Sequence, residues 1–520
     1  MTRFLKTALL ATSMLAPSVA LAQATPGSGD AAVTGAAGVE IVVTARKREE
    51  SLQEVPAAVS VATAESIDRL GLDNLTDIAK TTPGLIFDDS LGRDGNRPVI
   101  RGQANILGQS GVAYFIDGIY YTGSLADYDV DTIERVEVIK GPQSALYGRN
   151  TYSGAINIIS KLPGDVWEGR VTADISETDR YEFTAGVRGP LTDGLSLGVN
   201  GRYYDFGGEF TNQYDGTKIG QQMSWSLSGV LNWDNGGPFT AALRAYYNRT
   251  DDGQPAIFAQ SANLNNCFTD NGALYAGRGR YFCGVIEPRP VNSDYSRQFR
   301  DIESVGIEAD TYNVSLRMQL EMGDSLTLTS LSGFNDRRQT TLTDGDYSPD
   351  SFQTSIFTSF PLTTLPFPGP RNQVIGLVGT VTDFSFASLS ETSDWSQEIR
   401  LTYQSDAFDF IFGGYYFNQV DNTFGIRDIP SDSITRAQAQ VATRRAAVCA
   451  ANPRCFSTAL LFTPGVPNPT LVNPRDENLL DIENAAVFGA AEWHITPEIN
   501  LGIEGRYASE KIRQLSYDFD

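Results

Sequence analysis

Histidine, cysteine and positive charge are scarce in this sequence. Its 520 residues include one His and four Cys, and 40 Lys and Arg stand against 63 Asp and Glu, which gives a formal net charge of −23. Because binding to nucleic-acid phosphates needs a basic face, this acidic balance argues against a nucleic-acid partner. No apolar run of about eighteen or more residues occurs beyond the N-terminus, so the sequence predicts no transmembrane helix.

Glycine and aromatic residues, in contrast, are plentiful. The chain has 49 Gly, 22 Tyr and 27 Phe. Glycine and aromatic residues in alternating strands are typical of membrane β-barrels, whose hydropathy signal is weak in each strand. The length is enough for roughly two or three domains.

The N-terminal segment has the features of a secretory signal. Arg3 and Lys6 supply the positive charge, an apolar run follows, and residues 20–22 form an A-x-A cleavage site. We therefore expect residues 1–22 to be a signal peptide. Residues 23–50 should be a flexible periplasmic arm, because their first part is rich in Ala, Gly, Ser and Thr.

A short β-prone run lies on this arm, just before a charged stretch. Its residues are Glu40, Ile41, Val42, Val43, Thr44 and Ala45. On a flexible arm such a run makes a good donor strand, because its N–H and C=O groups can pair with an exposed sheet edge of a partner. The alternative is an ordinary first strand of the next domain.

The segment after the arm has the pattern of a small α/β domain. Thr63 can cap a helix over residues 64–70, and Asp73 or Asn74 can cap a second helix over residues 75–80. Further β-prone runs follow, so the segment can form one small core.

The longest motif of the chain begins at residue 133 and reads IERVEVIKGPQSALYGRNTYSGAINIISK. Two β-prone runs are separated by the turn residues Gly141 and Pro142 and by a short helical turn. Together with the triplet at residues 100–102, this pattern resembles the plug domain of TonB-dependent outer-membrane receptors. The resemblance implies that residues 51–162 are a plug inside the lumen of a β-barrel.

The resemblance also implies roles for particular residues. The run from Glu40 to Ala45 corresponds to the TonB box, which adds as a strand to TonB, a partner energised by an inner-membrane complex. Plug charges would pair with barrel carboxylates, and solvated strand edges are the alternative. The residues that match the plug motif are Arg101, Gly102, Glu134, Arg135, Glu137, Gly141, Pro142, Tyr147, Gly148, Gly154 and Asn157. Outer plug loops touch substrate in this family, which makes candidates of Asn96, Gln103, Asn105 and Gln109.

Apolar and polar residues alternate from residue 163 to residue 520, in strands of about ten residues. Short turns alternate with long polar segments near residues 205–220, 250–308, 336–391 and 420–482. Because membrane barrels have short periplasmic turns and long outer loops, we predict an antiparallel membrane β-barrel with the plug in its lumen. Such a protein lies in the outer membrane of a Gram-negative bacterium, in contact with lipid.

The strand count favours an incomplete barrel. About eleven strands is an odd and low number, since plugged transporters have about 22. We therefore expect this chain to hold about half of a 22-stranded barrel and to be truncated at its C-terminus.

The four cysteines fall in two of the long polar segments. Since each pair lies in one predicted outer loop, in an oxidising compartment, we predict the disulfides Cys267–Cys283 and Cys449–Cys455. A metal site is the alternative, but it lacks supporting His or further Cys.

These features predict TonB-dependent uptake of a scarce solute, with a ferric siderophore as the commonest implied cargo. No tightly bound cofactor is expected, and an iron chelate would be the substrate. The alternatives are uptake of a carbohydrate or another nutrient, or a passive porin, against which the segment before the barrel argues. A hydrolase lacks support, because no nucleophile motif is present and His494 lies away from any Ser or Asp constellation.

Overall fold

A computed structural model describes residues 40–88, 92–93, 97–103, 110–125, 128–212, 216–255, 306–344, 385–428, 475–496 and 499–519. By their contacts, residues 42–520 form one compact unit. Within the described ranges, no helix is both long and apolar enough to cross a membrane.

The N-terminal part of this unit is a small α/β domain. Its main sheet has the order β3-β8-β9-β6-β7, formed by β3 (Ala58–Thr63), β8 (Ile133–Lys140), β9 (Gly154–Ser160), β6 (Val112–Ile116) and β7 (Ile119–Tyr121). Neighbouring strands are antiparallel except for the parallel pair β6 and β9. Smaller elements complete the domain: β1 (Val42–Val43) with β2 (Glu50–Ser51), β4 (Leu85–Asp88) with β5 (Arg97–Ile100), α1 (Ala64–Leu70), α2 (Leu75–Lys80) and the 3-10 helix η1 (Val130–Thr132).

Both helices begin and end where the sequence predicts. The Thr63 side chain accepts a hydrogen bond from the Ser66 N–H, and α1 ends at Gly71, whose φ of 61° is left-handed. Asn74, rather than Asp73, caps α2 by accepting from the Asp77 N–H. The caps therefore set the residues at which each short helix begins and ends against the sheet.

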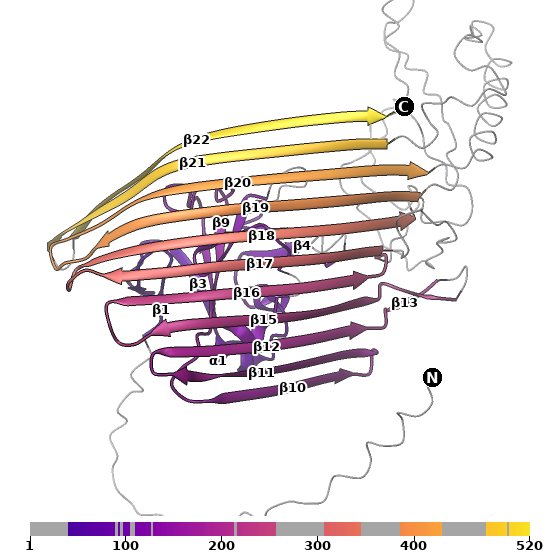
Figure 1. Ribbon diagram of the computed structural model, residues 1–520, viewed down its shortest axis with the longest axis horizontal. Helices are drawn as coiled ribbons and strands as arrows, with labels where there is room; N and C mark the ends of the chain where they lie inside the picture. Colours follow the sequence, from indigo (N-terminus) through magenta and orange to yellow (C-terminus); the bar gives the residue numbers. More distant parts are fainter. Residues whose placement is uncertain are drawn as a thin grey trace, which may run out of the picture. The chain divides into compact units, whose positions relative to one another are not determined.

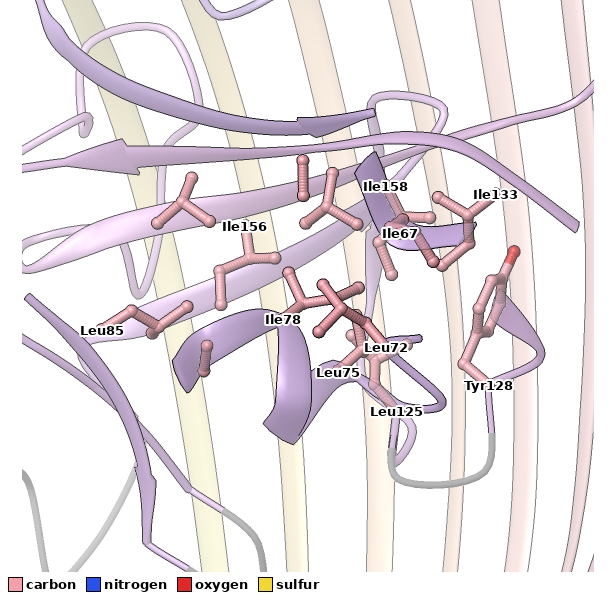
Figure 2. Close-up of a cluster of buried hydrophobic side chains, with 14 of the residues drawn as sticks. Ile67, Leu72, Leu75, Ile78, Leu85, Leu125, Tyr128, Ile133, Ile156 and Ile158 are labelled. Atoms are coloured by element: carbon pink, nitrogen blue, oxygen red, sulfur yellow. The ribbon is translucent and has the colours of Figure 1, made fainter. Parts of the chain in front are cut away.

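The apolar core lies between these helices and the main sheet (Figure 2). Ile78 of α2 packs with Ile133, Ile156 and Ile158 from β8 and β9, and each side chain is at most 1% exposed. Burial of one such side chain contributes about 1.5–3 kcal/mol, so this cluster is the main source of the domain's stability.

Most of the remaining described chain forms one sheet of eleven antiparallel strands, each paired with its neighbours in chain order (Figure 1). The strands are β10 (Glu168–Ser176), β11 (Arg180–Thr192), β12 (Leu195–Phe206), β15 (Gln222–Asp234), β16 (Phe239–Asp252), β17 (Gly306–Glu321), β18 (Leu326–Asp344), β19 (Ser385–Tyr403), β20 (Phe408–Asp428), β21 (Arg475–Thr496) and β22 (Ile499–Phe519). The short strands β13 (Phe210–Thr211) and β14 (Lys218–Ile219) form a separate hairpin.

The sequence predicts short turns at residues 192–194, 235–237, 323–324 and 405–407, and each of them joins two paired strands, but the strands are longer than predicted. Strands β18 to β22 have 19 to 22 residues, against the ten or so expected. Their additional residues lie at the ends away from the short turns and are largely polar, as in residues 335–344. Polar ends carry no apolar alternation, which is why the pattern identified only the part of each strand nearest the short turns.

The two faces of the large sheet differ in polarity. On one face Ser224, Ser226 and Arg202 are buried, while on the other Leu227 is 52% and Trp493 is 59% exposed. Side chains of the first face touch the α/β domain, as where the Thr184 hydroxyl donates to an Asp131 carboxylate oxygen over 2.7 Å. The polar face therefore lies against the small domain, and the apolar face is exposed.

Candidate functional site

The run that precedes the charged stretch is folded into the α/β domain from Val42 onward. Val43 is 0% and Ala45 is 1% exposed, and β1 pairs with β2. Residues 42–50, which the sequence predicted to belong to a flexible arm, are therefore folded. The apolar side chains of Val43 and Ala45 pack into the domain. The composition of the residues before them did not indicate this burial.

The Glu137 cluster, formed by Thr44, Arg135, Glu137 and Asn157, holds this segment. A Glu137 carboxylate oxygen accepts from the Thr44 N–H at 2.9 Å, and the other accepts from the Thr44 hydroxyl at 3.0 Å. The carboxylate also accepts from Arg135 Nε at 2.8 Å and from Asn157 Nδ2 at 3.3 Å. A buried charge is stable only when it is paired and hydrogen-bonded, and Glu137 is 0% exposed. Release of Thr44 would leave this carboxylate short of donors.

Asn157 links this cluster to a turn of the main sheet. Its side-chain oxygen accepts from the Gly118 N–H at 3.2 Å, and its Nδ2 donates to the Thr44 hydroxyl at 3.2 Å. Gly118 lies with Asp117 in the turn between β6 and β7, where both residues have positive φ. One buried amide therefore connects a plug turn with the N-terminal segment.

The basic triplet, Arg46, Lys47 and Arg48, continues the segment and pairs with the large sheet. Lys47 Nζ lies 2.5 Å from a Glu398 oxygen, in a pair that is 351 residues apart in the chain. Arg46 lies 2.8 Å from Glu492, which Arg48 also contacts. Burial lowers the pKa of Lys47 to about 8, although the Glu398 carboxylate opposes this shift.

Two further residues of β20 and β21 complete this contact. Arg48 Nη1 lies 2.8 Å from Asp409, and His494 Nε2 lies 3.2 Å from the same carboxylate oxygen. His494 also contacts Asn500, so the single histidine belongs to the structural contacts of the sheet. The sequence predicted no site at the basic triplet. Three consecutive basic residues in an otherwise acidic chain were the available signal.

The matched motif residues lie around this site or at turns. The Tyr147 hydroxyl donates to the Thr44 carbonyl at 3.3 Å. Positive φ values occur at Arg101, Gly102, Gly141, Gly148 and Gly154. At Gly154 a Cβ would lie 2.5 Å from the Ile139 carbonyl oxygen, so no larger residue fits. Of the proposed substrate contacts only Gln103 is described, and it forms an isolated bridge with Ile100.

Several predicted residues lie outside the described part of the chain. They are Asn96, Asn105, Gln109 and the cysteines Cys267, Cys283, Cys449 and Cys455. The two predicted disulfides therefore remain predictions.

Charged contacts between the plug and the sheet agree with the expectation in part. Arg93 and Arg149 lie 2.6 Å and 3.6 Å from the sheet carboxylates Asp252 and Glu510. Among the described residues, other motif charges do not reach the sheet. Arg135 pairs with Glu134 at 2.7 Å and with Glu137 at 2.8 Å, so these motif charges pair within the domain. Contacts with the sheet come from other residues, for example Asp73 with Arg180 at 2.6 Å. The motif strands lie inside the small domain, where their nearest opposite charges are their own neighbours.

The fold and the site define a class of protein. An α/β domain packs on the polar face of a large antiparallel sheet, whose other face is apolar. In addition, the segment that follows β1 is fastened to both parts, through Thr44 to Glu137 and through Lys47 to Glu398. This is the arrangement of a plugged outer-membrane receptor.

Known proteins agree with this class. Residues 51–155 match the family model described as TonB-dependent Receptor Plug Domain. The iron-regulated outer membrane virulence protein of Vibrio cholerae is 30% identical over 216 residues, which cover 37% of this chain and 31% of that protein. The ferripyoverdine receptor of Pseudomonas aeruginosa is 26% identical over 252 residues, which cover 46% of this chain and 30% of that protein.

A solved structure has the same fold. The ferric yersiniabactin uptake receptor FyuA from Yersinia pestis has a TM-score of 0.58 at 15% identity, over 88% of this chain and 61% of that chain. The chain matches about a third of the length of the two curated relatives. Residues 51–155 are a TonB-dependent receptor plug domain, and the chain is similar to outer-membrane receptors of Gram-negative bacteria.

Proposed function

We propose that this protein takes up a ferric siderophore across the outer membrane, with TonB as the source of force. The observation that carries the proposal is the segment from Val42 to Ala45, in which Val43 and Ala45 are buried. Its backbone is held by a buried carboxylate, through the Thr44 N–H and Glu137. A strand held in this way is a recognition element that can be stored and then released.

The names of several relatives support an iron chelate as the cargo. They include a ferripyoverdine receptor and a ferric enterobactin receptor of Pseudomonas aeruginosa, and the probable TonB-dependent siderophore receptor PiuA of Acinetobacter baumannii. Within this proposal the run from Glu40 to Ala45 is the TonB box. Transport, and not catalysis, is the activity.

The mechanism follows from the contacts of Asn157. Substrate at the outer plug loops would shift the turn at Gly118, whose N–H donates to the Asn157 side chain. The same amide donates to the Thr44 hydroxyl, so its displacement weakens the hold on the segment. Released residues 40–45 would then add as a strand to TonB, because backbone N–H and C=O groups give such pairing its affinity.

Force on the segment would next break the pairs of the basic triplet with Glu398, Asp409 and Glu492. These pairs join the segment directly to the sheet. Their rupture would let the plug change its packing against the polar face and open a path for the solute.

The test is uptake of radiolabelled iron by cells that express the full-length protein, with and without TonB. We expect accumulation of an ⁵⁵Fe-labelled siderophore only when TonB is present, and a higher abundance of the protein in outer-membrane fractions under iron starvation. TonB-independent accumulation would contradict the proposal. Unchanged abundance would direct the search to other nutrients.

Cobalamin is a second candidate cargo. The vitamin B12 transporter BtuB of Vibrio vulnificus is 36% identical over 126 residues, which cover 23% of this chain. Labelled cobalamin in the same uptake assay distinguishes the two. A carbohydrate would be identified by comparing abundance across growth substrates.

A further inference from the structure

The tight turn between β6 and β7, formed by Asp117 and Gly118, lies where the plug meets the large sheet. Both residues have positive φ, 53° at Asp117 and 80° at Gly118, as in the two-residue turns that close hairpins. The Asp117 carboxylate accepts a hydrogen bond from the Ser160 N–H at 2.9 Å, which joins the turn to the end of β9. The turn is therefore tied within the plug, and its contacts with the sheet help to set its position.

Gly333 of β18 allows the plug to come close beside this turn. A Cβ at residue 333 would lie 2.5 Å from Cγ2 of Ile119, the first residue of β7. Ile119 is buried and branched at its Cβ, so its methyl group has little freedom to turn away. A glycine inside a strand often marks such a close approach. A larger residue at position 333 would therefore push Ile119 and the turn away from the sheet.

Leu331 adds an apolar contact on the same face of β18. It is buried, although Thr329 and Asn335 on that face are polar. Its Cδ1 lies 3.7 Å from the place that a Cβ at Gly118 would occupy. Contact with the turn therefore helps to remove this apolar side chain from water.

Arg244 of β16 holds the turn from a second strand. Its Nε lies 3.7 Å from the Asp117 carboxylate, and its Nη1 donates to the Tyr128 hydroxyl at 2.8 Å. Arg244 is buried, and a buried cation is stable only when it is paired and hydrogen-bonded. Both of these partners belong to the plug, so Arg244 is a fixed contact between the two parts. Leu331, Gly333 and Arg244 together form a turn socket.

Gly118 connects the turn socket with the N-terminal segment. Its N–H donates to the Asn157 side-chain oxygen at 3.2 Å, and Asn157 Nδ2 donates to the Thr44 hydroxyl at 3.2 Å. Hydrogen bonds of this kind extend to about 3.2 Å, so both lie at the long end of the range. A shift of the turn by about 0.5 Å away from Asn157 would break the first of them. The amide that also holds Thr44 would then lose one of its contacts.

The large sheet therefore has its own route to the N-terminal segment, apart from the outer plug loops. β18 carries Leu331 and Gly333, and β16 carries Arg244. A shift of β18 against the plug would press Gly333 on Ile119, because the two are already in close contact. The turn would move with Ile119, which directly follows Gly118 in the chain.

We propose that the residues of the turn socket are positioning residues, through which the sheet sets how tightly the plug stores the N-terminal segment. The inference rests on the proposed function and adds a control on the release of the same segment. The alternative is that the turn socket only packs the plug against the sheet.

The test is the rate of cleavage by trypsin at the basic triplet, measured on the full-length protein in lipid vesicles. We expect Gly333→Ala to raise this rate about tenfold, which corresponds to about 1.4 kcal/mol, because the added methyl group displaces Ile119 and the turn. Gly414→Ala is the matched control, since this glycine lies in β20 and a Cβ there would meet no atom within 4 Å. It should be cleaved as wild type is.

A compensating substitution tests whether Gly333 acts through Ile119. Ile119→Ala removes the methyl group that a Cβ at residue 333 would meet. Adding it to Gly333→Ala should return the cleavage rate to within about threefold of wild type, as expected for two residues in direct contact. Ile119→Val keeps that methyl group, so adding it to Gly333→Ala should not slow cleavage. If the two changes only destabilised the plug, their effects would instead add.

Hydrogen exchange separates positioning from damage to the plug. In Gly333→Ala, exchange should become faster in residues 42–48 but stay unchanged in β8 and β9, which carry part of the plug core. Leu331→Ala and Arg244→Gln, which weaken the turn socket, should show the same pattern.

The outcomes distinguish the inference from the proposed function. The inference is overturned if Gly333→Ala is cleaved as wild type is, if exchange rises equally in β8 and β9, or if Ile119→Val rescues as well as Ile119→Ala. Affinity for the periplasmic domain of TonB tests the proposed function separately. If Gly333→Ala releases the segment but binds TonB no more tightly than wild type, the proposed role of the segment fails, whereas the control of its storage by the sheet stands.

Discussion

The plug and the large sheet follow opposite rules of polarity. In the plug, Ile133 and Ile158 are fully buried, and the exposed side chains of its helices, apart from Leu70, are polar or charged, as at Glu65 and Lys80. In the sheet, Ser224 is 0% and Asp394 is 2% exposed, while Leu227 on the other face is 52% exposed. The difference shows which medium each surface meets: the plug folds as a protein does in water, and the outer face of the sheet matches lipid.

The region where the two parts meet follows a third rule. Charges there are buried but paired, as in Lys47 with Glu398 and Arg93 with Asp252. Replacing a buried pair by apolar residues is often neutral or stabilising, so such pairs are weak evidence for stability. We infer that they hold the parts in register and can be exchanged when the segment moves.

The largest effect should follow from a charge in the plug core. Ile158→Asp places a carboxylate among Ile78, Ile133 and Ile156, and we expect a loss of about 4 kcal/mol or more in the stability of the plug. Hydrogen exchange of β8 and β9, followed by mass spectrometry, measures it. Leu70→Asp, at a position 55% exposed, is the control and should change little. Equal exchange in the two variants would contradict the assignment of the core.

The reverse substitution sharpens the comparison at the apolar face. Leu227→Arg should destabilise the protein in lipid vesicles by about 2–4 kcal/mol, although Leu227 is half exposed. Leu227→Phe is the matched control, and it should be tolerated because the face stays apolar. Urea titration of the vesicle-inserted protein gives both values. A harmless arginine here would mean that this face does not meet lipid.

A smaller effect is expected where the segment joins the plug. Glu137→Gln keeps the shape of the side chain but removes the carboxylate charge that accepts hydrogen bonds from Thr44 and Arg135. We expect the free energy that holds the segment around Thr44 on the plug to fall by about 1–3 kcal/mol. The measurement is protease cleavage after the basic triplet, which should become faster. Glu134→Gln on the same strand, with a side chain 53% exposed, should cleave as wild type does. Identical cleavage rates in the two variants would mean that Glu137 does not hold the segment around Thr44 on the plug.

The smallest effect should come from a helix cap in the plug. Asn74→Ala removes the acceptor for the Asp77 N–H at the start of α2, which should cost about 1 kcal/mol of plug stability. Asn74→Ser retains a capping oxygen and should cost much less. Thermal unfolding of the plug, monitored by hydrogen exchange, compares them. If both variants lose the same stability, the cap contributes nothing.

Much of the fold could be predicted from the sequence, because its signals are local. Capping residues Thr63 and Asn74, turn residues such as Asp193 and Gly194, and the alternation in the strands each act within a few residues. These signals predicted both helices of the plug, the eleven-stranded sheet and the positions of its short turns.

The candidate site could be predicted only in part, because its contacts join distant residues. Lys47 and Glu398 are 351 residues apart, and no local pattern links them. The run around Val43 was recognised as a strand, but its burial depends on the plug surface and on Glu137, 93 residues away from Thr44. The turn socket likewise joins sheet residues to a plug turn, and only the fold brings them together.

We propose that the run from Glu40 to Ala45 is a TonB-binding strand, and that Glu137 stores its part from Val42 onward in the plug. The most direct measurement is the affinity of the purified full-length receptor for the periplasmic domain of TonB, without substrate. We expect Glu137→Gln to bind about tenfold more tightly than wild type, because storage no longer competes with binding. Adding Val43→Pro should abolish this binding, since proline removes a strand N–H. Unchanged affinity in Glu137→Gln, or full binding in the Val43→Pro double variant, would contradict the claim.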